Sequence, residues 1–165
     1  MRNFISRAGE NLIPAFQLSL RAAVAAGLAL IAAQLLRLQH PLYAMISAVI
    51  VTDLVAAQTP KLALPRLAGT LVGGALGAVI STLLPAGAWA AVFGIFAAMF
   101  ASHLLYLQGA ARVAGYVCGI VLLDHGDSPW SYALFRMIET ALGIVAAMGV
   151  SVVPKLLKSK NPDGT

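Results

Sequence analysis

Apolar residues occur along this chain in long runs, separated by short polar or proline-containing segments. A helix needs about 20 apolar residues to span a bilayer, and unpaired backbone groups are too costly in lipid for a non-helical segment to cross it. The runs are also too long for the alternating strands of an outer-membrane barrel. The pattern therefore predicts an all-α, polytopic membrane protein with six transmembrane helices, at 18–36, 42–57, 67–84, 87–105, 110–123 and 133–153.

Two short segments flank the predicted membrane domain, which covers 18–153. Residues 1–17 place apolar positions near one helical face and charges elsewhere, a pattern that favours a short helix on the cytoplasmic membrane surface. We expect Pro14 to interrupt that helix. Residues 154–165 form a polar, basic tail.

The composition supports a membrane protein. The chain has 165 residues, of which 60% are hydrophobic and 10% charged, whereas an ordinary soluble domain carries roughly 25% charged residues. A chain of this length leaves too much surface in water to hide so many apolar side chains, so the lipid bilayer is its expected partner. The net charge of +5 is scattered between apolar runs, which favours membrane-flanking residues over a nucleic-acid surface.

The charges also predict the orientation. Six spans place both termini on one side of the membrane, and on that assumption nine Lys and Arg residues share the terminal side while two, Arg37 and Arg136, lie opposite. Positive residues gather in cytoplasmic loops, so both termini are expected in the cytoplasm. Four aromatic residues then fall at the outer interface, where amphipathic rings prefer to lie: Tyr43, Trp89, Trp130 and Tyr132.

The chain contains an internal repeat. The skeleton Arg-x-x-x-Thr-x-x-Gly occurs twice, 70 residues apart: Arg66, Thr70, Gly73 and Arg136, Thr140, Gly143. A Leu-Leu-x-Leu-Gln segment likewise occurs at 35–39 and at 104–108. We interpret 18–84 and 87–153 as two repeats of three spans each. Because three is odd, the second repeat must be inverted in the membrane, which is typical of transport folds.

Each repeat places charges at unfavourable helix ends. Arg66 and Arg136 stand at the predicted start of a helix, where the macrodipole is already positive, and Asp53 and Asp124 follow the preceding helices, where it is negative. Pairing Asp53 with Arg66 would relieve both defects in the first repeat, and Asp124 would pair with Arg136 in the second. Glu139, one helical turn from Arg136, is a competing partner. Two interpretations stay open: structural clasps, or ion pairs that line or gate a pathway.

Arg21 lies three residues into the first predicted span. It either snorkels to the interface or faces an anion, because a guanidinium grips carboxylates with two hydrogen bonds. With Arg66, Arg136, Thr70 and Thr140 it forms the candidate substrate pathway. Gly69, Gly73 and Gly77 recur at four-residue spacing, which predicts close helix packing. Gly143, the last residue of the second skeleton, is expected to pack in the same way.

Motifs for other chemistry are missing from the sequence. The three histidines are isolated from one another, and the single Cys118 lies in an apolar run, so neither a metal site nor a disulfide is expected. The glycine-rich stretch from 69 to 77 lacks the lysine of a phosphate-binding loop, and hydrolase and protease motifs do not occur. We therefore expect no catalytic residues and no cofactor, which leaves transport or a scaffold role.

The stretch YAMISAVIVT, which leads into Arg66, Gly69, Thr70 and Gly73, resembles the fusaric-acid-resistance-like superfamily of aromatic acid exporters. The stretch around Arg136 is its counterpart in the last helix. The resemblance implies six-helix units in the bacterial inner membrane that export or conduct small organic, aromatic carboxylate anions. Many members carry a large cytoplasmic domain, whereas this chain is a single unit, which favours a homodimer. A non-transporting scaffold or accessory subunit is the alternative.

The predicted orientation can be tested with single cysteines in a Cys118→Ala background. A Gly126→Cys variant should react with a membrane-impermeant thiol reagent in intact cells, because its loop is expected outside. A Lys160→Cys variant should react only after the membrane is opened. Labelling of the Lys160→Cys variant in intact cells would overturn the orientation.

Overall fold

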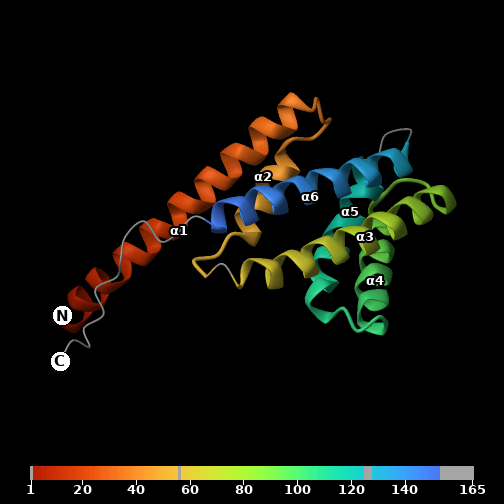
Figure 1. Cartoon of the computed structure of the whole chain (residues 1–165). Coiled ribbons are helices and arrows are strands. Elements are labelled where there is room, and N and C mark those ends of the chain that lie inside the picture. The colour runs from red at the N-terminus through yellow and green to blue at the C-terminus, as the bar shows by residue number, and fades with distance from the viewer. Residues whose placement is uncertain (1, 56, 125–127, 153–165) are drawn as a thin grey trace.

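A computed structural model describes residues 2–55, 57–124 and 128–152, with side chains from residue 12 onward. The predicted tail, 154–165, lies outside the described residues. The described part is all-helical, with six α-helices and one short 3₁₀-helix (Figure 1). Their bounds are α1 Arg2–Leu35, α2 Leu42–Val51, α3 Thr59–Leu83, α4 Ala88–Leu104, η1 Gln108–Ala110, α5 Ala111–Asp124 and α6 Pro129–Val152.

Three of the described helices are long and apolar enough to cross a membrane. They cover Leu12–Leu35, Thr59–Leu83 and Pro129–Val152, and the described helices Leu42–Val51 and Ala88–Leu104 are apolar but shorter. Large apolar side chains point outward, whereas the interior is built mainly from alanine and glycine (Phe16, Leu28, Trp89, Phe93, Phe96 and Leu134 are all exposed). This distribution is typical of helices packed in lipid, where small residues let backbones approach.

Several predicted helix ends were wrong. α1 continues through Pro14 instead of stopping there. α3 begins at Thr59 rather than at residue 67, and Pro60 occupies its first turn, where the missing backbone N–H is not needed. α6 begins at Pro129 rather than at residue 133. Both long helices therefore start about two turns before the arginines of the repeated skeleton, Arg66 and Arg136, which are not at the helix starts.

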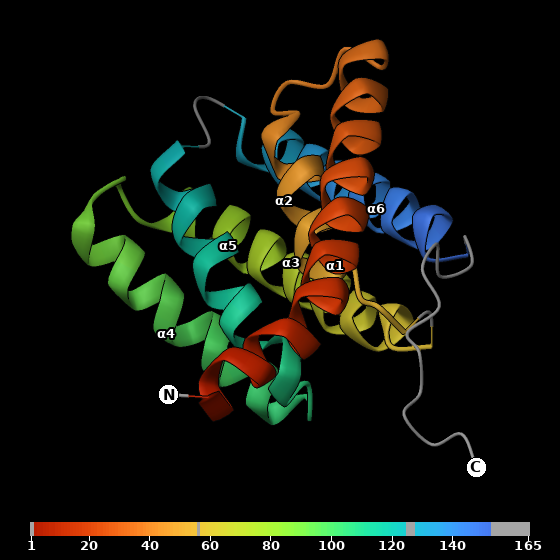
Figure 2. The same ribbon diagram turned by 90° about the vertical axis from the view of Figure 1, so that its left-hand side faces the viewer.

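The two long helices are exchanged between the halves of the chain. One core cluster joins α6 to α1 and α2, and a second joins α3 to α4 and α5. Figures 1 and 2 show these two groups of helices from two directions, with α3 and α6 in contact between them. The first group is built on the alanine stripe of α1, whose members are completely buried: Ala25, Ala29 and Ala33. The last helix of each half therefore packs mainly against the first two α-helices of the other half: α3 against α4 and α5, and α6 against α1 and α2.

The connections in the two halves share a backbone feature. Arg37 follows α1 and Tyr106 follows α4, and both adopt a positive φ, of 52° and 57°. A non-glycine residue with positive φ is uncommon. These residues are the variable third members of the two Leu-Leu-x-Leu-Gln segments, so the same motif makes the same left-handed turn twice.

Glycines allow two matching close approaches. A Cβ at Gly73 would collide with the backbone of Ala114 on α5, and a Cβ at Gly143 would collide with the backbone of Ala44 and Ala48 on α2. Gly69 and Gly77 also face α5. Because backbone atoms cannot rotate away, each long helix depends on a missing side chain at its contact with a short helix of the other half.

The contact at Gly143 yields a stability prediction. Replacing Gly143 with Ala should lower the stability of the detergent-solubilised protein by about 1–3 kcal/mol, because the new methyl group overpacks a backbone contact. Gly149→Ala is the matched control, since nothing lies within 4 Å of a Cβ at that position of the same helix. Thermal unfolding measures both, and equal effects of the two substitutions would contradict the contact.

Candidate functional site

The candidate site lies where α3 and α6 cross. Thr70 on α3 and Thr140 on α6 are buried, and their hydroxyl oxygens are 3.5 Å apart. The Thr70 hydroxyl donates to the backbone O of Arg66 at 2.9 Å. A hydroxyl has one hydrogen, so the bond between the two threonines is donated by Thr140. The two halves of the chain thus meet through a buried polar contact at this crossing.

Arg66 lies one turn from Thr70 and is 3% exposed. Its Nε and Nη2 donate to Ser47 Oγ of α2 at 3.3 and 3.2 Å. Its Cζ lies 5.2 Å from the ring centroid of Tyr116 on α5, within the range of a cation–π contact. Among the described residues, one hydroxyl and one ring therefore hold this guanidinium, and no carboxylate bonds to it.

Arg136 lies one turn from Thr140 and is 2% exposed. Its Cζ lies 3.2 Å from the ring centroid of Tyr43 on α2. Its Nε and Nη1 are buried without a hydrogen-bond partner in the part of the chain that the structure describes. The Tyr43 and Tyr132 hydroxyls are 3.4 Å apart, and Tyr132 donates to Asp124 Oδ2 at 3.0 Å. Asp124 therefore connects to the site through tyrosines.

Glu139 on α6 is completely buried. Its Oε1 accepts the backbone N–H of His40 at 2.8 Å, while Oε2 has no hydrogen-bond partner among the described residues. The carboxylate interacts electrostatically with Arg136, one turn away on the same helix. A buried carboxylate with one unbonded oxygen is unusual, because native proteins satisfy nearly all buried polar atoms.

The two predicted Asp–Arg clasps do not form within the described residues. Asp53 instead accepts the backbone N–H of Val55 at 2.8 Å, in a local turn, while Arg66 bonds to Ser47. Asp124 is exposed and bonds to Tyr132 rather than to Arg136. The reason is the early start of α3 and α6, which carries both arginines about two turns into the molecule.

Arg21 is buried on α1, with 9% of its surface exposed. Its Nη1 donates to the backbone O of Leu54 at 3.2 Å, in the segment after α2. The bond connects α1 to the chain between α2 and α3. The structure thus brings Arg66, Arg136 and the two threonines to one helix crossing and gives Arg21 a contact at the end of α2.

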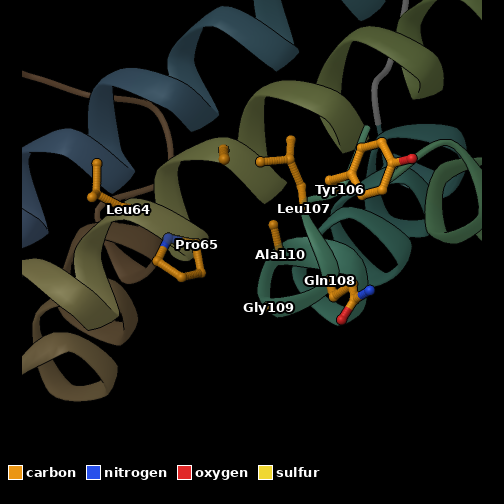
Figure 3. A pocket seen from close by; sticks show the side chains of 8 residues that line it. Leu64, Pro65, Tyr106, Leu107, Gln108, Gly109 and Ala110 are labelled. Atoms are coloured by element: carbon orange, nitrogen blue, oxygen red, sulfur yellow. The ribbon is translucent and has the colours of Figure 1, made fainter. Parts of the chain in front are cut away.

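Two hollows have residues of α3 in their walls. One, of about 170 Å³, lies between α3 and α6, and Thr70 and Trp130 are among its lining residues. The other, of about 400 Å³, has Leu64 and Pro65 of α3 on one wall and the connection between α4 and α5, residues 106–110, on the other (Figure 3). Among the described residues, neither hollow has a charged lining residue, and the smaller one includes Thr70 of the helix crossing in its lining.

Sequence reasoning missed the residues that surround the arginines. Ser47 gave a weak signal, as a polar residue in the middle of the apolar stretch YAMISAVIVT. Tyr132 was expected at the outer interface, but it is 5% exposed and belongs to the hydrogen-bond chain of the site. His40 gave no signal, because its contact with Glu139 is made by its backbone. In the described part of the chain, no group of three or more His, Cys, Asp or Glu residues could hold a metal ion.

An all-helical chain with apolar outward faces, a small-residue core and buried arginines is an integral membrane protein. The chain belongs to the fusaric acid resistance protein-like family, which it matches over residues 28–150. This confirms the resemblance drawn from its motifs, and the family is one of membrane transporters. No curated protein and no solved structure matches the chain.

The contacts of Arg66 predict which neighbour stabilises it. Ser47→Ala should destabilise the protein in detergent by about 1.5–3 kcal/mol, because the buried guanidinium loses its hydrogen-bond acceptor. Asp53→Asn should change the stability little, since an amide oxygen can still accept from Val55. Thermal unfolding compares the two. A loss in Asp53→Asn as large as in Ser47→Ala would favour the ionic clasp instead.

Proposed function

We propose that the protein moves small organic carboxylate anions, in particular aromatic ones, across the bacterial inner membrane. The observation that carries this proposal is the charge of the interior. Among the described residues, three arginines are buried but only one carboxylate, that of Glu139. Charges buried in a membrane span are costly and are usually functional. An interior with excess positive charge favours an anion as its ligand.

The small hollow supports an aromatic substrate. Its volume of about 170 Å³ is close to the roughly 150 Å³ of an engineered apolar cavity that binds benzene. Thr70 supplies a polar group at its wall and Trp130 an aromatic ring. Arg66 and Arg136 each lie one turn from the Thr70–Thr140 contact. Neither guanidinium lines the hollow, so we propose that the ring of the substrate occupies the hollow while its carboxylate is directed past Thr70 towards a guanidinium.

The membrane arrangement that we propose has six spans in two inverted repeats, with both termini in the cytoplasm. The two left-handed turns at Arg37 and Tyr106 support the repeat, as do the matching approaches at Gly73 and Gly143. Short helices in corresponding positions of two repeats are typical of a translocation site. The 10-residue α2 and 14-residue α5 occupy such positions.

We also propose a homodimer. The hollow between α3 and α6 has exposed apolar residues on its rim, Leu71 and Leu134. A second copy packed over this rim would close the hollow and shield a bound anion from lipid. An open hollow that faces acyl chains would otherwise admit lipid in place of an anion.

Transport can be measured with radiolabelled benzoate in proteoliposomes. Arg66→Gln and Arg136→Gln should each weaken benzoate affinity about 10- to 150-fold, which corresponds to the loss of a charge-assisted hydrogen bond of roughly 1.5–3 kcal/mol. Lysine at either position should retain part of the activity, because it keeps the charge but loses the planar fork. Arg21→Gln tests the remaining predicted pathway arginine in the same assay.

Arg112→Gln is the control for these variants, because Arg112 is exposed. Flux that is saturable and needs a pH gradient would indicate a coupled transporter, whereas unsaturable flux would indicate a channel. If wild-type liposomes pass no aromatic or dicarboxylic anion faster than empty ones, the transport function is wrong and the scaffold role replaces it.

A further inference from the structure

The two halves of the site differ at one matched position. Glu139 stands where the first half has Gly69, each three residues after the arginine of the repeated skeleton. A Cβ at Gly69 would collide with the backbone of Ala110, whereas Glu139 accepts a hydrogen bond from the backbone of His40. Residues 40 and 110 lie one and two residues after the matched Gln39 and Gln108. At corresponding places, the glycine on α3 lets the backbones approach directly, whereas α6 has a carboxylate between them.

Among the described residues, buried polar atoms without partners gather around Glu139 and not around Gly69. Arg66 shares Ser47 Oγ between two of its nitrogens. Around Glu139, by contrast, Arg136 Nε and Nη1, Glu139 Oε2 and His40 Nδ1 are all buried without a hydrogen-bond partner in the described ranges. Buried polar atoms in native proteins are almost always bonded.

We propose that Glu139 takes up a proton when a carboxylate anion binds at Arg136, and releases it when the anion leaves. The inference rests on the proposed transport function. Two carboxylates that share one guanidinium rarely remain ionised together, and Oε2 is the oxygen free to carry the proton. One proton moves from water to Glu139 for each anion bound, and no other bond is made or broken. Anion movement is thereby linked to proton movement.

Other titratable groups adjoin this pair. Electrostatic interactions connect Arg136 to Tyr43 on α2, Tyr132 on α6, Asp124 on α5 and Arg66 on α3. His40 precedes α2 and contacts Glu139. α1 also packs against α6, and its Arg21 donates to Leu54. Histidine exchanges protons near neutral pH, so His40 is the competing proton site that an experiment must separate from Glu139.

Isothermal titration calorimetry of the purified full-length protein with benzoate tests the inference. Titrations in two buffers of different ionisation enthalpy report the protons taken up on binding. At a pH at which Glu139 is ionised in the free protein, the wild type should take up about one proton, and its affinity should rise about tenfold for each unit of falling pH. Glu139→Gln, which retains an oxygen for the His40 N–H, should bind benzoate without proton uptake and with little pH dependence. Asp53→Asn, a carboxyl substitution outside the cluster, is the matched control and should behave as wild type.

A spectroscopic measurement on the wild type covers the case in which Glu139→Gln does not fold. Addition of benzoate should produce the infrared carbonyl band of a protonated carboxyl group, and Asp53→Asn should show it as well. Failure of the band to appear while benzoate binds would overturn the inference.

The remaining outcomes separate the inference from the transport function. Benzoate binding without proton uptake overturns the inference and leaves transport standing. Proton uptake that persists in Glu139→Gln and disappears in His40→Gln assigns the proton to His40, and again overturns it. A wild-type protein that neither binds nor moves benzoate or other aromatic carboxylates overturns both proposals.

Discussion

The close approach of each long helix to a short helix of the other half governs the interior of this protein. In lipid, helices gain little from the hydrophobic effect when they associate, so the contact distance sets the attraction. Gly73 against Ala114 and Gly143 against Ala44 bring the backbones together because no side chain intervenes. α3 and α6 also contact each other, with Gly74 against Ala133 and with the Thr70 and Thr140 hydroxyl oxygens 3.5 Å apart. The site is a consequence of this packing, since residues one turn away on either helix must then be buried.

Burial decides how the two matched arginines are held. A guanidinium in a membrane interior must find acceptors or aromatic rings, because water and lipid head groups are out of reach. Arg66 finds a hydroxyl and a ring in Ser47 and Tyr116. Arg136 finds the face of Tyr43 and the charge of Glu139. The two arginines of the repeated skeleton thus have different surroundings. Arg136 has two nitrogens without a hydrogen bond among the described residues, and it is the one at which we propose that an anion binds.

The repeated skeleton could be read from the sequence, but the role of its arginines could not. Charge placement at helix ends suggested clasps with Asp53 and Asp124, and that reasoning depended on where each helix begins. Prolines near both starts suggested loops, yet a proline fits the first turn of a helix as well as it fits a turn. The additional two turns move Arg66 away from Asp53 and towards Ser47. An error of a few residues at a helix end therefore changed the partner of a buried charge.

The sequence by itself determined that this is an all-helical membrane protein of the fusaric acid resistance protein-like family. The length and apolar character of the runs suffice for the first conclusion, and the spacing of Arg66, Gly69, Thr70 and Gly73 indicated the second. Only the tertiary structure decided that α3 and α6 change places between the halves, and that Glu139 meets His40. Such contacts join residues far apart in the chain, and they depend on how closely backbones approach. Hydrophobic patterns report which residues are apolar, but not which helix each one will face.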